Sequence, residues 1–212
     1  MAPRPPGYRL LSHDRKLGAR RVAGADEVGR GCLAGPLVVA SVCYDVERVD
    51  RRRLAQLDDS KRVPPELREE LFTAIMQMAL QVVVIAVPAA EIDRRGLHKS
   101  NLRALGQALE SLDPAPDVCL TDGFSVPGCG REHSRLIGGD GRSAAIAAAS
   151  IVAKVVRDRH MHRMADRYPE YGFERHVGYI TPEHGAAVRL HGVTPLHRRS
   201  WHARAYAELE LA

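Results

Sequence analysis

The sequence predicts an α/β fold in which one mixed sheet is flanked by helices and followed by a small helical C-terminal region. Strand-like and helix-like segments alternate along the chain, which is typical of this class. The β-branched run Gln81–Val87 favours a strand. In Ser100–Leu112, by contrast, Leu102, Leu105 and Leu109 stand at helical spacing. The length of 212 residues suits one domain with a substantial core.

Each predicted strand is a short apolar or β-branched run that ends at a turn signal. The second, rich in valine, follows the first closely enough to be its hairpin partner. The fourth ends in Asp-Gly, which is typical of a turn. In chain order the strands are expected at Arg21–Val28, Pro36–Tyr44, Gln81–Val87, Asp117–Asp122 and Arg135–Gly138.

The helices are predicted from apolar spacing and from their first residues. Proline is tolerated in a first turn, as at Pro65. The longest helix begins with small residues that allow close packing on a sheet, and it places Ile146, Ser150, Ala153 and Arg157 on one side. The expected helices are Pro64–Leu80, Pro88–Arg95, Ser100–Leu112 and Ser143–Arg167, then one starting at Thr181-Pro182-Glu183 and one after Ser200.

One catalytic domain is expected over residues 21–212, including a helical C-terminal region from about residue 168. Residues 1–20 are expected to be a tail and lead-in, because Met1 to Gly7 are rich in proline and arginine. We see no internal repeat and no low-complexity linker.

Composition narrows the class of protein. Apolar residues make up 45% and charged residues 27% of the chain, as in ordinary soluble domains. The net charge of +5 and the pI of about 9.2 favour a polyanionic partner. The cysteines show no C-x-x-C pairing, which favours reduced thiols and a cytoplasmic location. No apolar run approaches the length of a membrane span, and no signal peptide is visible.

Acidic residues mark the predicted strand ends. Asp26 and Glu27 close the first strand, Asp122 closes the fourth, and Asp140 precedes the longest helix in a Gly-Gly-Asp-Gly sequence. Sites of α/β proteins gather at strand ends. Converging carboxylates there would form an all-oxygen site for Mg²⁺ or Mn²⁺. Zinc is not expected, because His160 and His162 are too close to share a helix face and Cys119 and Cys129 lack ligand spacing.

Each acid has an alternative explanation when taken alone. Asp122-Gly123 is also typical of a plain turn, and Asp140 of a helix cap. Neighbouring residues of a regular strand face opposite ways, so Asp26 and Glu27 cannot both point inward. Either the strand bends at Glu27, or one of the two acids acts through water or backbone.

Six ordered motifs resemble ribonuclease HII over nearly the whole chain apart from the N-terminal tail. The first joins Asp26-Glu27-Val28-Gly29-Arg30-Gly31 to Leu33-Ala34-Gly35-Pro36, and it is followed by Asp59-Ser60-Lys61 and Asp122-Gly123. The others are Gly139-Asp140, the helix segment Ala147–Val155 with Arg157-Asp158, and Gly178-Tyr179 with His184 ahead of His197-Arg198-Arg199-Ser200. At 212 residues, the chain is expected to lack the extra N-terminal domain of the related ribonuclease HIII.

The resemblance implies a ribonuclease H-like fold with a five-stranded mixed sheet. It implies hydrolysis of the RNA strand of RNA–DNA hybrids and incision 5′ of ribonucleotides embedded in duplex DNA, leaving 3′-hydroxyl and 5′-phosphate ends. Mn²⁺ or Mg²⁺ in a two-metal site would be the cofactor. The expected partners are hybrid and ribonucleotide-containing duplex, without a membrane, and the chain is expected to be a monomer.

Carried over by motif, Asp26, Glu27, Asp122 and Asp140 would be the catalytic, metal-binding acids. Gly29, Arg30 and Gly31 would contact the ribose 2′-hydroxyl, and Tyr179 would stack on the following deoxyribose. Ser60, Lys61 and Lys154 are further candidates for substrate contact, although Lys154 and Arg157 suit packing or pairing as well. The sequence departs from the family pattern at Cys32, Gly138 and Val177, where the family commonly has proline, lysine and lysine.

The remaining polar residues allow structural explanations. Asp158 stands four residues after Lys154, which favours a salt bridge within the helix. His197-Arg198-Arg199, with His202, suits a clamp on a nucleic-acid backbone or a solvated charge run. Trp201 is expected to anchor the last helix in the core.

Three functions compete at this point: a metal-dependent ribonuclease H, a silent nucleic-acid-binding module on the same fold, and a metal-dependent phosphotransferase or phosphatase. The complete acid set disfavours the second. The third is disfavoured because the chain has no phosphate loop of the G-x-x-x-x-G-K type.

Overall fold

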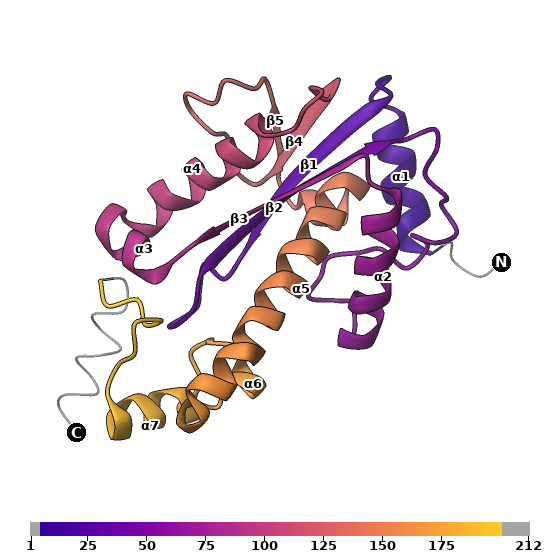
Figure 1. The fold of residues 1–212 in the computed structure, drawn as a ribbon. Helices are drawn as coiled ribbons and strands as arrows, with labels where there is room; N and C mark the ends of the chain where they lie inside the picture. The colour runs from indigo at the N-terminus through magenta and orange to yellow at the C-terminus, as the bar shows by residue number, and fades with distance from the viewer. Residues whose placement is uncertain (1–4, 201–212) are drawn as a thin grey trace.

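A central five-stranded sheet organises the computed structural model, which describes residues 5–200. Its strand order is β3-β2-β1-β4-β5 (Figure 1). Strand β1 pairs with β2 and β2 with β3 in antiparallel register, whereas β1 with β4 and β4 with β5 are parallel. The strands are β1 (Arg21–Val28), β2 (Leu37–Asp45), β3 (Gln81–Val87), β4 (Val118–Asp122) and β5 (Ser134–Leu136). The predicted mixed α/β sheet is confirmed.

Helices cover both faces of this sheet. The long helix α5 (Ala144–Arg167) crosses one face and packs with α1 (Pro6–Arg15) and α2 (Pro65–Met78) over one core (Figure 1). On the other face, α3 (Ala89–Arg95) and α4 (Leu97–Glu110) enclose a second core.

A third, smaller core lies in the C-terminal region. It joins the turn after β1 to the end of α5 and to the short elements that follow, around Tyr171 and Phe173. These elements are the 3₁₀ turn η2 (Pro169–Tyr171), α6 (Phe173–His176) and α7 (Pro182–His191), and a further 3₁₀ turn, η1 (Gly139–Gly141), precedes α5. The long helix expected to end at Arg167 is confirmed as α5. The helix expected to start at Thr181 is confirmed as α7, for which Thr181 is the N-cap. The helix expected after Ser200 and the role expected of Trp201 lie outside the described residues.

The N-terminal segment differs from its prediction. Helix α1 begins at Pro6, inside the stretch expected to be a loose tail, and it buries Leu10 and Leu11 in the core beneath α5. A proline in the first turn is compatible with helix, because the first amides have no helical partner. Gly7 packs so closely that a Cβ there would lie 1.8 Å from the Leu54 carbonyl oxygen. Among residues 5–200, no helix combines the length and apolar character needed to cross a membrane.

Candidate active site

Three carboxylates meet at one edge of the sheet. The parallel register of β1 and β4 pairs Ala25 with Thr121, so the next residue on each strand is an aspartate, Asp26 and Asp122. Asp140 joins them from η1. One oxygen from each of these three side chains lies within 4.8 Å of the others. We call Asp26, Asp122 and Asp140 the aspartate cluster.

Close backbone packing holds the aspartate cluster together. The Gly139 amide donates a hydrogen bond of 2.7 Å to Asp122 Oδ1, and a Cβ at Gly139 would lie 2.5 Å from Ile146 Cδ1. A Cβ at Gly24 would lie 2.2 Å from the backbone nitrogen of Ile146. The absence of side chains at these two glycines therefore lets α5 lie directly on β1 and brings η1 against Asp122.

Burial and mutual repulsion disfavour the ionised forms of the carboxyl groups in the aspartate cluster. Burial raises the pKa of Asp26 well above its ordinary value, and the charges of Glu27 and Asp122 raise it further. Burial is also the main cause that raises the pKa of Asp122 and of Asp140, and the nearby Lys61 partly offsets both. Carboxylate oxygens in this arrangement fit a hard divalent cation, which would relieve their repulsion.

Glu27 faces the opposite side of β1. Its carboxylate Oε1 lies 3.4 Å from Arg30 Nη1, while Oε2 is buried without a hydrogen-bond partner among the described residues. Strand β1 does not bend there, because pairing with β2 continues through Val28. The Glu27 amide instead donates to Asp26 Oδ1 at 2.7 Å, so this residue orients its neighbour through the backbone.

The turn after β1 presents backbone next to this edge. Gly29 has φ of 90°, and a Cβ there would lie 2.4 Å from Arg157 Nε, so the position requires glycine. The Arg30 guanidinium lies over the Phe124 ring at 4.5 Å. Around Gly31 there is open space where a Cβ would stand, so the backbone there can be approached by a ligand.

Residues 23–204 match the family model of ribonuclease HII. The chain belongs to the ribonuclease HII family. A ribonuclease HII from Geobacillus kaustophilus (strain HTA426) is 49% identical over 195 residues, covering 91% of this chain and 73% of its own length. One from Nocardia farcinica (strain IFM 10152) is 49% identical over 180 residues, covering 85% and 71%. The crystal structure of ribonuclease H2 from Pyrococcus horikoshii OT3 superposes with a TM-score of 0.77 at 27% identity, covering 91% of this chain and all of that one. The protein is therefore a ribonuclease H enzyme.

In this ribonuclease HII chain, Tyr179 lies beside the turn that contains Gly29–Gly31. It forms an antiparallel bridge with Cys32. Two cations approach its ring, with Lys154 Nζ 5.4 Å and Arg157 Cζ 5.6 Å from the ring centroid. The structure thus places this aromatic residue and Lys154 together, as substrate contacts in one region would require.

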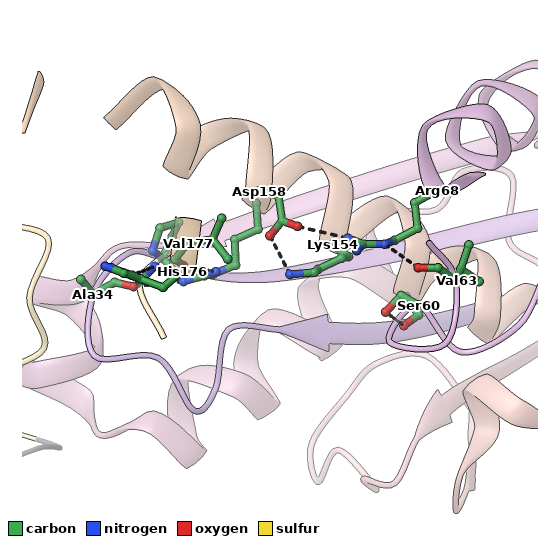
Figure 2. Close-up of polar contacts among 12 residues, drawn as sticks. Ala34, Ser60, Val63, Arg68, Lys154, Asp158, His176 and Val177 are labelled. Atoms are coloured by element: carbon green, nitrogen blue, oxygen red, sulfur yellow. Dashed lines mark hydrogen bonds and ion pairs between the residues drawn. The ribbon is translucent and has the colours of Figure 1, made fainter. Parts of the chain in front are cut away.

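A salt-bridge network fixes Lys154. Lys154 Nζ lies 2.8 Å from one carboxylate oxygen of Asp158, and Arg68 Nη1 lies 3.2 Å from the other (Figure 2). The predicted pairing of Asp158 with Lys154 is confirmed. Asp158 therefore positions the ammonium group near Tyr179.

Ser60 and Lys61 differ in their surroundings. Ser60 is buried, and its hydroxyl lies 2.9 Å from the Ser150 hydroxyl on α5 (Figure 2). Ser150 in turn lowers the pKa of Asp26. Lys61 has a side chain that is 80% exposed and lies near the aspartate cluster, where it can reach an anionic ligand.

His197 and Arg198, in the basic segment 197–199, are buried. These two residues therefore form neither a solvent-exposed charged segment nor a surface clamp on a nucleic-acid backbone. Arg198 donates through Nη2 to the Gly35 carbonyl at 2.8 Å and through Nη1 to the Arg30 carbonyl at 3.2 Å. The buried guanidinium of Arg198 therefore stabilises the turn after β1 through hydrogen bonds to its backbone carbonyls. Arg199 is exposed, and His202 lies outside the described residues.

Sequence reasoning missed Asn101. This residue is fully buried in α4, and its side chain lies beside Glu27, whose pKa it lowers. The available signal was its helical spacing from Ala104, Leu105 and Ala108, which places a polar amide on the apolar face of α4. Both polar atoms of this amide are buried without a hydrogen-bond partner among the described residues, as is the neighbouring Glu27 Oε2.

Proposed function

We propose that this enzyme hydrolyses the RNA strand of RNA–DNA hybrids and incises 5′ of single ribonucleotides in duplex DNA. The products would carry 3′-hydroxyl and 5′-phosphate ends. The observation that carries the proposal is the position of the aspartate cluster at one sheet edge, with the turn Gly29–Gly31 and Tyr179 near the same end of β1.

Two Mn²⁺ or Mg²⁺ ions would activate water and neutralise charge on the phosphodiester. Asp26, Glu27, Asp122 and Asp140 would hold them. Glu27 is outside the aspartate cluster, but its charge interacts with those of Asp26 and Asp122. Asp26 Oδ1 is already directed by the Glu27 amide, and Asp122 Oδ1 by the Gly139 amide. These hydrogen bonds fix the carboxylates in advance, which reduces the reorganisation needed during reaction.

Sugar selection would come from the backbone and from Tyr179. The 2′-hydroxyl distinguishes RNA from DNA, and exposed backbone groups around Gly31 can hydrogen-bond to it. Tyr179 would stack on the next sugar, where a second 2′-hydroxyl fits poorly. Lys154, held by Asp158, and the exposed Lys61 would contact phosphates.

A denaturing gel with two substrates tests this proposal. Duplex DNA with one ribonucleotide should be cut on its 5′ side, and uniform hybrid should also be cleaved, in Mn²⁺ or Mg²⁺. Tyr179→Ala should lower the junction cut more than uniform cleavage, because uniform RNA offers no deoxyribose for stacking. Tyr179→Phe, which keeps the ring, should retain it. Absence of any cut at the single ribonucleotide would refute junction specificity, and equal losses on both substrates would make Tyr179 a structural residue.

A further inference from the structure

The segment that carries Tyr179 has a strained backbone. Val177 has φ of 42° and Gly178 has φ of 82°. The left-handed region is unfavourable for a β-branched residue such as valine, and such a conformation persists only where surrounding contacts impose it. Glycine is required next, because a Cβ at residue 178 would lie 2.3 Å from the Ala34 carbonyl oxygen.

Hydrogen bonds from buried side chains hold this turn. Arg157 Nη1 donates to the Val177 carbonyl at 2.8 Å; Figure 2 shows Val177 with His176 beside Ala34. The Gly178 amide donates to His176 Nδ1 at 3.2 Å, and the Tyr179 carbonyl lies 2.9 Å from His184 Nδ1. Two of the three contacts therefore come from histidines, on α6 and α7.

The partners determine the tautomer of each ring. His176 Nε2 lies 2.8 Å from the Tyr171 carbonyl and must carry a proton, which leaves Nδ1 to accept from Gly178. His184 Nδ1 faces the Tyr179 carbonyl and must carry the proton, so its Nε2 is an acceptor. That nitrogen lies 3.1 Å from His197 Nε2, which must then be the donor.

A second contact of His197 supports the assignment of its proton to Nε2. His197 Nδ1 accepts from the Thr194 amide at 2.9 Å, as a ring protonated on Nε2 requires. An additional proton on His184 would set two N–H groups against each other, and one on His197 would oppose the Thr194 amide. His184 and His197 therefore satisfy each other only when both are neutral, and an additional proton on His176 Nδ1 would oppose the Gly178 amide.

Packing around the rings supports the neutral form. His176 stacks on His184 with centroids 4.4 Å apart, and Tyr171 and Phe173 enclose the group. Among residues 5–200, the titratable or charged groups that face it are these three histidines, Tyr171, Glu183 beside His184, Arg199 beside His197, and His191, whose ring lies 6.1 Å from that of Tyr171. Burial lowers the pKa of His184 and of His197 to about 4.

We propose that His176, His184 and His197 are positioning residues for Tyr179. Their hydrogen bonds in fixed tautomers hold the turn 177–179 in its strained conformation, and so place the Tyr179 ring for stacking on the deoxyribose. This inference rests on the proposed function for the sugar-reading role of Tyr179, whereas the arrangement of the rings does not depend on it.

The tautomers can be measured on the wild-type protein without any variant. Long-range ¹H–¹⁵N correlation NMR of the imidazole nitrogens at pH 7 should show three neutral rings. The proton should be on Nε2 of His176, Nδ1 of His184 and Nε2 of His197. A charged ring or another tautomer at any of the three would overturn the arrangement, whatever the enzyme cleaves.

Activity assays test the positioning role. His184→Ala removes the donor to the Tyr179 carbonyl, and it should lower the ratio of junction cutting to uniform-hybrid cleavage about tenfold, the effect of one lost hydrogen bond. His184→Asn places an amide N–H near the position of Nδ1 and should recover most of that ratio. Leu190→Ala, an exposed change in the same helix, should leave the ratio unchanged.

The outcomes separate the two proposals. A folded His184→Ala protein with an unchanged ratio would refute the positioning role, as would equal losses on both substrates without recovery in His184→Asn. Thermal unfolding checks that each variant is folded, and if His184→Ala does not fold, the comparison of His184→Asn with wild type decides. A wild-type enzyme that does not cut at single ribonucleotides refutes the junction specificity alone, because the NMR result stands separately.

Discussion

At the scale of single residues, the site is governed by where each polar atom finds a partner. Asp26 and Glu27 are adjacent, yet strand geometry sends one carboxylate into the aspartate cluster and the other towards Arg30 and Asn101. Arg198 is buried beneath the turn after β1 with backbone acceptors. The site therefore combines contacts between near neighbours, such as Glu27 with Arg30, and contacts between residues far apart in the chain, such as Arg198 with Arg30.

Asp26→Asn should lower cleavage at least about 100-fold, in the range found when one preorganised electrostatic group is removed. The fold should survive, because the amide oxygen can still accept from the Glu27 N–H. Removing a buried carboxylate from a repulsive cluster should also raise the unfolding temperature of the metal-free protein. Hybrid cleavage and calorimetry in EDTA measure the two effects. The control is Asp166→Asn, an exposed change near the end of α5, and near-wild-type turnover by Asp26→Asn would contradict the assignment.

At the scale of elements, the contact between α5 and β1 builds the site. The start of α5 is almost entirely alanine and isoleucine, and all its residues from Ala144 to Ala149 are buried. Gly24 lets that helix approach the strand backbone directly. The same helix also carries Lys154 and Asp158, labelled in Figure 2, and Ser150 and Arg157. One packing contact therefore places several polar groups at once.

Gly24→Ala should therefore destabilise the protein by about 1–3 kcal/mol, as overpacking of a tight core does. It should also reduce kcat, because displacement of α5 moves Ser150 and η1 relative to Asp26. Urea unfolding and hybrid-cleavage kinetics measure both quantities. Gly185→Ala is the matched control, since a Cβ there meets no atom closer than Arg189 Nη1 at 3.8 Å and alanine favours helix. Equal stability of the two variants would show that the α5–β1 contact is more tolerant than the distances indicate.

At the scale of the whole molecule, net positive charge and buried histidines set the response to solution conditions. The charge of +5 favours association with a polyanion. The strained carboxylates and the buried histidines have opposite effects on stability as pH falls, because the former have raised pKa values and the latter lowered ones.

Hybrid affinity should weaken steeply with salt, because phosphate contacts release counterions. With three or more phosphate contacts, the slope of log affinity against log salt should be about −3 or steeper. Kd should be measured with the Asp26→Asn protein in EDTA, so that cleavage does not interfere. A slope near zero would exclude binding dominated by the nucleic-acid backbone.

The free energy of unfolding should contain a histidine contribution that is fully present above pH 6.5. It should be lost as the pH falls towards 4, because the unfolded chain then binds protons that folded His184 and His197 do not. One such ring contributes up to about 3 kcal/mol. Urea unfolding of wild type and His184→Asn across this window measures the difference, in which the carboxylate effects cancel. Identical pH profiles would contradict the lowered pKa of His184.

The sequence by itself determined the α/β class, the strands Arg21–Val28 and Gln81–Val87, and the long helix to within one residue, because apolar period and turn residues are local signals. It also determined the family, because the six ordered motifs are short contiguous sequences that can be identified without the structure. Only the tertiary structure decided that Glu27 turns away from the aspartate cluster, that Arg198 is buried, and that α1 begins at Pro6. The contact from Arg198 to the Arg30 carbonyl spans 168 residues of chain, and no local pattern encodes such a pairing. The histidine tautomers also depend on the tertiary structure, because the hydrogen-bond partners of each ring determine which nitrogen carries the proton.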